Sequence, residues 1–423
     1  MRKRLLIAAG VAAVVLLAAG GYVAYRMHQG RNIVGSSTVQ FTTTALPRKP
    51  VTANPQGIVW PMWGYDGQRL RSPVGIALRP PFRKIWTFHG HALLEFPPAV
   101  AYGRLYLTTF WGRFYALDEK TGKPVWTYNS GRCGWSSPAV ADHVVYQTFI
   151  GHPNCNNDIP GTDGEVVALD ARNGKVLWRY HEGPDESSAL VAHGLVYVGN
   201  WNGDELAIDA RTGKLRWSFH TGGKIKGSAA IAGPNIVVGS YDGHVYALNA
   251  RTGKQVWRAS AQPRLAGSLG TFYSTPSVAY GRVYIGNTDG KIYAYGSKTG
   301  DLLWSRSTGG YVYSSPAVSN ERVYAGSYDG SFYALSAATG ETLWTFQSNG
   351  PISGAPTVLD GIVYFSTFKE RTYGLDAQTG KLVWSYPDGK YSPIVADTKR
   401  VYLVGFGRMY GLVPAGRRAP KTR

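Results

Sequence analysis

Cysteine, methionine and acidic side chains are scarce in this sequence. Its 423 residues include two cysteines, Cys133 and Cys155, and 4 methionines. Two cysteines exclude a disulfide-dense scaffold, and their spacing does not match the paired ligands of known zinc sites. No phosphate-binding loop, Gly-x-Ser-x-Gly element or HExxH motif occurs. The common signatures of P-loop nucleotide binding, α/β-hydrolase and zinc-protease chemistry are therefore missing.

The shortage of acids is concentrated at the two ends of the chain. The sequence holds 45 lysines and arginines against 26 acids, a net charge of +19. Residues 1–90 contain 12 of the basic residues and one acid, Asp66, and the tail from Pro414 adds four basic residues and no acid. The body between them, with 29 basic and 25 acidic residues, offers no obvious basic stripe for phosphate contacts. We therefore predict no nucleic-acid partner.

The N-terminus carries a long apolar run. Leu5–Tyr25 is 21 residues without a charge and follows three basic residues. As a helix it spans about 30 Å, enough to cross the hydrocarbon core. The basic residues favour a cytoplasmic N-terminus. We predict a single-pass membrane anchor in residues 1–31; the alternative is a cleaved signal peptide with a poor cleavage site at residues 18–20. Either way the body is expected outside the cytoplasm, in the periplasm or at the cell surface.

Three further segments follow the anchor. Residues 32–57 are rich in Ser, Thr and Pro without an amphipathic period, which predicts a flexible tether. Residues 58–413 form the body, and residues 414–423 form a solvated basic tail. No cysteine lies near the anchor, so a lipid attachment there is excluded.

The body repeats one pattern about every 40 residues. Each unit has a small-residue stretch such as "SSPAV", a "VYxG" segment, an Asp-Gly-type turn, a "YALD" segment, then "TGK" and a tryptophan. Four short strands joined by turns, repeated at this period, are the signature of a β-propeller blade. The closing tryptophans of the seven complete units are Trp126, Trp178, Trp217, Trp257, Trp304, Trp344 and Trp384.

An eighth blade is expected from the two ends of the body. After Trp384 the chain supplies three strands without a fourth, and the "RKIWTFHG" segment around Trp86 is a fourth strand without its first three. We predict that the Trp86 strand completes the C-terminal blade. The fold is then an all-β, eight-bladed propeller of four-stranded antiparallel blades, preceded by a transmembrane helix.

The run Ala-x-Asp-x-x-Thr-Gly-Lys-x-x-Trp carries a family resemblance. It occurs as "ALDEKTGKPVW" (116–126), "ALDARNGKVLW" (168–178), "AIDARTGKLRW" (207–217) and "GLDAQTGKLVW" (374–384). It resembles the tryptophan-docking repeat of eight-bladed propellers of the pyrroloquinoline quinone (PQQ) type, over roughly residues 60–413. That superfamily includes quinoprotein alcohol dehydrogenases and the BamB-type lipoprotein of outer-membrane assembly. The resemblance implies that each tryptophan, Trp86 included, packs against the neighbouring blade.

The funnel mouth of the propeller is the first candidate site. The innermost strands align on a Val or Ile, and the residue five positions earlier in each blade is expected on the rim. Two acids, two lysines and three aromatics there could grip a polar ligand or a peptide; the alternative is an ordinary solvated rim. This candidate ring is Glu95, Trp135, Glu186, Lys226, Tyr273, Tyr313, Ser353 and Lys390.

Two insertions and the two cysteines lie near the same face. Cys133 precedes an innermost strand and Cys155 lies in the insertion "GHPNCNNDIPGTDG" (151–164), so a disulfide between them is predicted. A second insertion is "QPRLAGSLGTFYS" (262–274). Extra loops on one face of a repeat protein commonly mark the binding face, although tolerated surface loops are an equal alternative.

Three functions remain open from the sequence. The resemblance implies that an enzyme would sandwich PQQ between adjacent disulfide-bonded cysteines and a tryptophan, beside Ca²⁺ or a lanthanide. No adjacent cysteine pair is present, so no cofactor and no metal are predicted, and PQQ with calcium is kept as the runner-up. We expect a non-catalytic scaffold in the cell envelope, holding a protein or polymer on one face. A ligand- or glycan-binding sensor is the third alternative.

Overall fold

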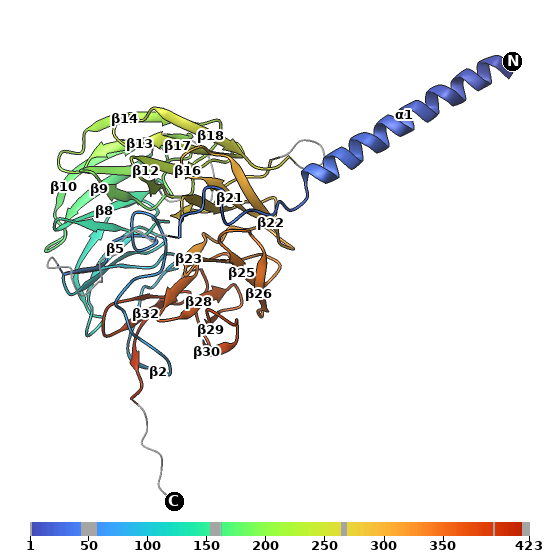
Figure 1. The fold of residues 1–423 in the computed structure, drawn as a ribbon. Helices are drawn as coiled ribbons and strands as arrows, with labels where there is room; N and C mark the ends of the chain where they lie inside the picture. The colour runs from blue at the N-terminus through green and yellow to red at the C-terminus, as the bar shows by residue number, and fades with distance from the viewer. Residues whose placement is uncertain are drawn as a thin grey trace, which may run out of the picture.

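The computed structural model describes residues 2–43, 57–152, 161, 163–263, 269–391 and 394–416, with the backbone alone for residues 2–9 and 25–29. Eight twisted sheets stand around a central axis, and the helix α1 (Arg2–Gln29) projects away from them (Figure 1). The structure confirms the eight-bladed, four-stranded propeller. The first sheet gains a fifth, innermost strand, β1 (Ile58–Trp60), which pairs with Ala99–Ala101.

The strands follow chain order within each blade, from the axis outward. The first three blades comprise β3 (Ala99–Ala101), β4 (Arg104–Thr108), β5 (Arg113–Asp118) and β6 (Pro124–Asn129); β7 (Ala139–Ala141), β8 (Val144–Phe149), β9 (Gly164–Asp170) and β10 (Val176–Glu182); and β11 (Leu190–Ala192), β12 (Leu195–Gly199), β13 (Asp204–Asp209) and β14 (Leu215–His220). The next two comprise β15 (Ala230–Ala232), β16 (Asn235–Gly239), β17 (His244–Asn249) and β18 (Gln255–Ser260); and β19 (Ser277–Ala279), β20 (Arg282–Gly286), β21 (Lys291–Gly296) and β22 (Leu302–Ser307).

The last three blades complete the ring. They comprise β23 (Ala317–Ser319), β24 (Arg322–Gly326), β25 (Ser331–Ser336) and β26 (Thr342–Gln347); β27 (Thr357–Leu359), β28 (Ile362–Thr367), β29 (Arg371–Asp376) and β30 (Leu382–Tyr386); and β31 (Val395–Ala396), β32 (Val401–Val404), β33 (Arg408–Pro414) and β2 (Phe82–His89). In the eighth blade β2 pairs antiparallel with β33, with Thr87 opposite Tyr410. The two ends of the body thus share one sheet, as the sequence predicts.

Tryptophan side chains join each blade to the next. Seven of the eight tryptophans, Trp86 to Trp344 in chain order, donate from the indole Nε1 to a backbone oxygen of the following blade. The distances are 2.9–3.3 Å, as from Trp304 to Ala337. The ring lies against the glycine of that blade's Thr-Gly or Asn-Gly turn. A Cβ on Gly340 would stand 2.6 Å from Trp304, so the turn has no space for a side chain. The eighth, Trp384, packs edge-on against Phe82 of β2, with ring centroids 5.4 Å apart.

A segment before the first blade lines the central channel, which the sequence pattern does not predict. Residues 58–72, here called the channel segment, pass from blade to blade and accept hydrogen bonds from innermost-strand amides. Gly67 accepts from Ile231 of β15, and Arg71 accepts from Val358 of β27. These carbonyl groups satisfy amides that would otherwise point into the channel unpaired.

Two arginines of the channel segment are buried between the blades. Arg69 and Arg71 are 0% and 1% exposed. The Arg69 guanidinium donates to backbone oxygens of Ser188, Ala189 and Ala229, and Arg71 donates to Pro316. Burial lowers the pKa of both groups to about 9. The side chains therefore tie the channel segment to several blades at once.

The N-terminal helix is present, and its described side chains, residues 10–24, are all exposed. Among the residues that the structure describes, no helix is both long and apolar enough to cross a membrane. Residues 30–43, here called the N-terminal arm, lie along blades five and six, although the sequence indicates a flexible tether from residue 32. Ile33 forms a β-bridge with Ser305 of β22, and Arg282 donates to the backbone oxygens of Ser36 and Val39.

Replacing the interlocking glycine tests the contact between blades. Gly340 and Gly103 both have φ of +73°, but a Cβ at Gly103 would meet no described heavy atom within 4 Å. Gly103→Ala should cost about 1–2 kcal/mol through left-handed backbone strain alone. Gly340→Ala should cost about 1–3 kcal/mol more, because its Cβ would overlap the Trp304 ring. Chemical denaturation of both variants measures the difference, and equal losses would contradict the interlock.

Candidate site at the funnel mouth

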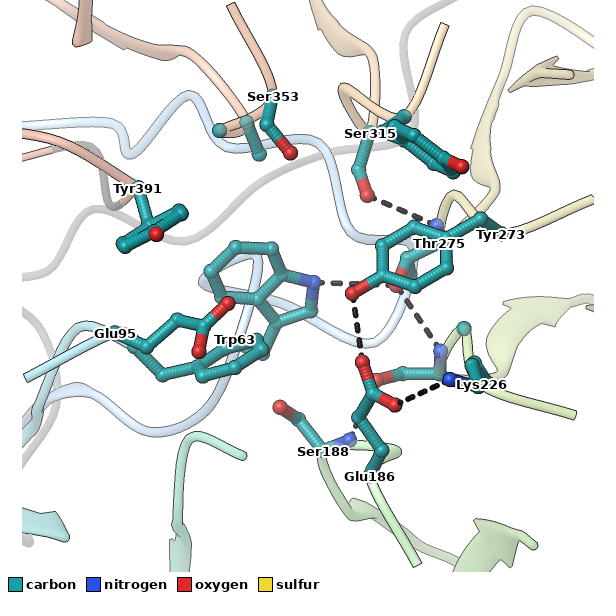
Figure 2. Close-up of a pocket in the computed structure, with 16 residues that line it drawn as sticks. Trp63, Glu95, Glu186, Ser188, Lys226, Tyr273, Thr275, Ser315, Ser353 and Tyr391 are labelled. Atoms are coloured by element: carbon teal, nitrogen blue, oxygen red, sulfur yellow. Dashed lines mark hydrogen bonds and ion pairs between the residues drawn. The ribbon is translucent and has the colours of Figure 1, made fainter. Parts of the chain in front are cut away.

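A cavity of about 50 Å³ opens on the axis, on the side of the connections between blades. Its walls combine acidic, hydroxyl and aromatic side chains from several blades (Figure 2). Six of the eight residues predicted for the ring line it: Glu95, Glu186, Lys226, Tyr273, Tyr313 and Ser353. Most of the side chains chosen by aligning the innermost strands in the sequence therefore lie together in one cavity.

Glu186 is the centre of the polar network in this cavity. It is buried, accepts a hydrogen bond from the Tyr273 hydroxyl at 2.6 Å, and lies with its Oε2 3.2 Å from the Lys226 Nζ. The Lys226 ammonium also stands 4.5 Å from the centroid of the Trp201 ring. Burial, and then the charge of Glu186, raise the pKa of Tyr273 well above its usual value. The hydroxyl therefore stays protonated and remains a donor.

Glu95 faces the cavity from the opposite wall (Figure 2). Burial raises the pKa of its carboxyl group to about 8; the negative charge of Glu186 acts in the same direction, and Lys226 opposes it. Two carboxyl groups that share a small cavity disfavour each other's ionised form. At pH 7 the Glu95 carboxyl group is therefore mostly protonated. Glu186, in contrast, is paired with the ammonium of Lys226.

Trp63 of the channel segment and a belt of hydroxyl groups complete the cavity. The Trp63 indole donates to Thr275 Oγ1 at 3.2 Å. In the belt, the backbone amide of one blade donates to the hydroxyl of the next, as Ser188 does to Ser228 and Thr275 does to Ser315. These links hold neighbouring inner connections in register. The repeat pattern does not single out Trp63, because this residue precedes the first repeat.

The other two residues of the predicted ring lie outside the cavity. Trp135 belongs to an aromatic cluster with Phe110 and Trp201, at centroid distances of 5.3 and 6.5 Å. Lys390 lies 3.9 Å from Glu370 and 4.4 Å from the centroid of the Phe406 ring. Both side chains therefore contact aromatic rings outside the cavity.

An arc of aromatic side chains surrounds one side of the mouth. Successive ring centroids are 4.8–5.4 Å apart from Tyr273 of blade five to Tyr391 of blade eight. The arc is made of Tyr273, Tyr313, Tyr328, Phe368 and Tyr391. Three more aromatic residues on loops of this face are exposed: Trp111, Tyr311 and Phe406, at 57%, 50% and 45%.

A second group of acids is buried where blades two and three meet, with Glu182 at the end of β10, Asp185 in the connection that follows and Glu205 in β13. Glu182, Asp185 and Glu205 are at most 8% exposed, and Asn200 donates to Glu182 Oε2 at 3.3 Å. Burial raises the pKa of all three, that of Glu205 to about 8. The charge of Glu182 adds to the shifts of Asp185 and Glu205. Across the described parts of the chain, no group of three or more His, Cys, Asp or Glu is arranged to hold a metal ion.

The predicted disulfide falls partly outside the described residues. Cys133 is buried, with its sulfur 3.9 Å from the His152 carbonyl oxygen, whereas Cys155 is not described. The pairing therefore stays a prediction. Of the insertion at 151–164, the described residues include Asp163, whose Oδ1 lies 2.6 Å from His152 Nδ1. Of the insertion at 262–274, Phe272 is buried and Tyr273 reaches the cavity.

Comparison with known families agrees with this geometry. The family model described as outer membrane protein assembly factor BamB matches residues 77–218, 162–311 and 307–418. The chain belongs to this BamB family of PQQ-like propellers. The matches together extend over nearly the whole propeller, from before β2 to beyond β33.

Individual relatives include both BamB and dehydrogenases. The crystal structure of BamB from Moraxella catarrhalis has a TM-score of 0.64 at 18% identity, covering 81% of this chain and 100% of that one. A europium-containing methanol dehydrogenase has a TM-score of 0.71 at 14% identity, covering 85% and 98%. These likenesses show the fold alone. The 1-butanol dehydrogenase (cytochrome c) of Thauera butanivorans is 27% identical over 192 residues, which are 40% of this chain and 25% of that protein.

The residues present do not fit a PQQ site of the kind that the dehydrogenase resemblance implies. The cavity of about 50 Å³ is far below the roughly 300–1,000 Å³ of typical cofactor and ligand sites. The only cysteines, Cys133 and Cys155, are not adjacent in the sequence. The cavity carboxylate Glu186 is already engaged by Lys226 and Tyr273. We therefore derive no redox step for this site.

The buried acid Glu205 predicts a pH dependence of stability. Because its pKa is raised to about 8, the folded state binds a proton that the unfolded chain releases above about pH 4.5, so this group lowers stability as pH rises from 4.5 to 8. Glu205→Gln should therefore gain in melting temperature relative to the parent at pH 8 and change little at pH 5.

A surface acid provides the opposite control for that measurement. Arg216 and Thr212 lower the pKa of the Asp209 carboxyl group below its usual value. Asp209→Asn should lower the melting temperature equally at pH 5 and pH 8, since Asp209 is ionised at both. A Glu205→Gln variant that is destabilised more at pH 8 than at pH 5 would contradict the assigned protonation.

Proposed function

We propose that the protein is a non-catalytic binding platform of the cell envelope, holding a protein or an envelope polymer on its funnel-mouth face. The observation that carries this proposal is the gathering of exposed Trp111, Tyr311 and Phe406 on loops around the cavity. Exposed aromatic side chains surrounding a buried polar network are typical of interaction surfaces. The match to the BamB family supports the same function.

We further propose that α1 anchors the propeller in a membrane, with the propeller outside the cytoplasm. The support is the apolar sequence of Leu5–Tyr25 and the exposure of the described helical side chains. The N-terminal arm fixes where the helix leaves the propeller, because Lys291 donates to the Gly30 carbonyl and Ser307 to Asn32. An anchor attached at blade five would hold the propeller close to the bilayer with its edge towards it.

A quinoprotein dehydrogenase is the second candidate function. The similarity to the Thauera butanivorans 1-butanol dehydrogenase favours it, although the chain spans a quarter of that protein. The size of the cavity and the engaged Glu186 weigh against it.

A cofactor titration separates the two candidates. The full chain in detergent, titrated with PQQ in the presence and absence of Ca²⁺, should show no saturable change in absorbance or melting temperature well above micromolar cofactor. A quinoprotein alcohol dehydrogenase stripped of its cofactor is the positive control. One-to-one binding of PQQ with a raised melting temperature would contradict the binding platform and support a quinoprotein dehydrogenase.

Site-specific cross-linking tests the binding face. A photoreactive residue placed at Trp111 or Tyr311 should yield discrete adducts in cells of the native host. The matched controls are Val125 and Leu343, exposed side chains of the outermost strands β6 and β26. Adducts from the outer strands and none from the mouth would show that the funnel-mouth face is not the one that binds.

A further inference from the structure

We propose that the funnel-mouth cavity binds a primary ammonium group, presented as a lysine side chain of a partner protein. The inference rests on the proposed binding platform and assigns the chemistry of its central contact. The group would enter between Glu95 and Glu186, beneath the aromatic arc.

The first argument is the charge of the cavity. Its lining contains two carboxyl groups, Glu95 and Glu186, and one ammonium group, that of Lys226. With all three ionised the cavity carries a formal charge of −1, which is costly in a confined site of low polarity. A ligand ammonium would supply the balancing positive charge.

The second argument is how this face already holds lysines. Lys226 Nζ lies 3.2 Å from the Glu186 carboxylate and 4.5 Å from the Trp201 ring centroid. Lys390 Nζ lies 3.9 Å from Glu370 and 4.4 Å from the Phe406 ring centroid. Both combine a carboxylate with an aromatic face, which attracts cations. Glu95 together with the aromatic arc offers a third set of the same two components.

The third argument is size. A cavity of about 50 Å³ admits an ammonium group and the methylene next to it, while a sugar ring or a fused-ring cofactor is too large. Two methylene groups of a lysine could then lie along Tyr391 at the rim (Figure 2).

Proton exchange accompanies this binding. At neutral pH a proton on Glu95, whose pKa is about 8, balances the charge of the cavity. The arriving ammonium replaces that proton, which leaves to solvent. Among the described residues, the charged and titratable groups around Glu95 are Glu186, Lys226, Tyr273, Tyr313, Tyr328 and Tyr391. Arg71 of the channel segment donates to Ser277 and Pro316, with its guanidinium 5.1 Å from the Trp63 ring centroid.

The experiment is a calorimetric titration of the full chain with Nα-acetyl-lysine methylamide. We expect weak, millimolar binding, and at least tenfold weaker binding of the Nε-acetylated analogue, which has no charge. Affinity should rise by up to about tenfold per pH unit from pH 6 to 8, because Glu95 must lose its proton. Titrations at pH 7 in phosphate and HEPES buffers, which contain no primary amine, should show release of nearly one proton.

Two variants locate the site. Glu95→Gln should abolish the proton release and weaken binding at least tenfold at pH 8. A cooperative melting transition at or above the parent's temperature is the check of folding. The matched control is Glu341→Gln, since Glu341 accepts from Thr339 in a hairpin turn of the opposite face, and it should bind as the parent does.

The outcomes separate this inference from the platform itself. Equal affinity for the charged and acetylated ligands, no binding, or affinity independent of pH would overturn the ammonium site. If cross-links from Trp111 and Tyr311 persist in that case, the binding face stands and only its central chemistry is wrong. If the titration shows no ammonium binding and the cross-linking yields no adducts from the mouth, both the ammonium site and the binding platform are wrong.

Discussion

The interlock between a tryptophan of one blade and a glycine of the next is the contact on which the whole structure depends. In seven of the blade contacts the ring fills the space that a Cβ would take, and its indole nitrogen donates to a backbone oxygen of the same turn, as Trp304 does with Gly340 and Ala337. Because the contact combines shape with a hydrogen bond, it fixes both the distance and the angle between blades. Repetition of that angle leads the chain around a ring, and the pairing of β2 with β33 closes it, because the eighth blade then takes strands from both ends of the body.

A closed ring of this width leaves a channel whose inner strands expose backbone amides. The channel segment satisfies several of them, and in doing so places Trp63 at the base of the funnel and two guanidinium groups among the blades. The floor of the candidate site is thus a consequence of filling the channel. Its walls come from the connections that precede each innermost strand, so one side chain from each of several blades meets on the axis. Residues more than a hundred positions apart, such as Glu95 and Tyr273, become neighbours for this reason.

The repeat makes most of the fold predictable, since every repeat of the sequence contains the same strands, turns and tryptophan. The same periodicity brings six of the eight residues predicted for the ring into the cavity, because equal spacing from the innermost strand means equal height on the axis. Trp135 and Lys390 depart from it where neighbouring aromatic rings draw the side chain aside. Trp63, the hydroxyl belt and the docked N-terminal arm were not predicted. Their partners lie far away in the sequence, and a Ser/Thr-rich segment such as residues 32–43 has the composition of a linker whether or not a surface such as Arg282 captures it.

The same propeller serves enzymes and binding platforms, so the side chains on the axis must decide which it is. A dehydrogenase site needs an open cavity and carboxylates free to hold a metal beside the cofactor. Here the carboxylate of Glu186 is occupied by Lys226 and Tyr273, and the second acid, Glu95, is kept neutral by its surroundings at pH 7. A neutral, buried acid close to aromatic rings does little for redox chemistry, but it is well suited to exchange its proton for a cation. This arrangement supports the proposal that the site recognises a charged group on another molecule.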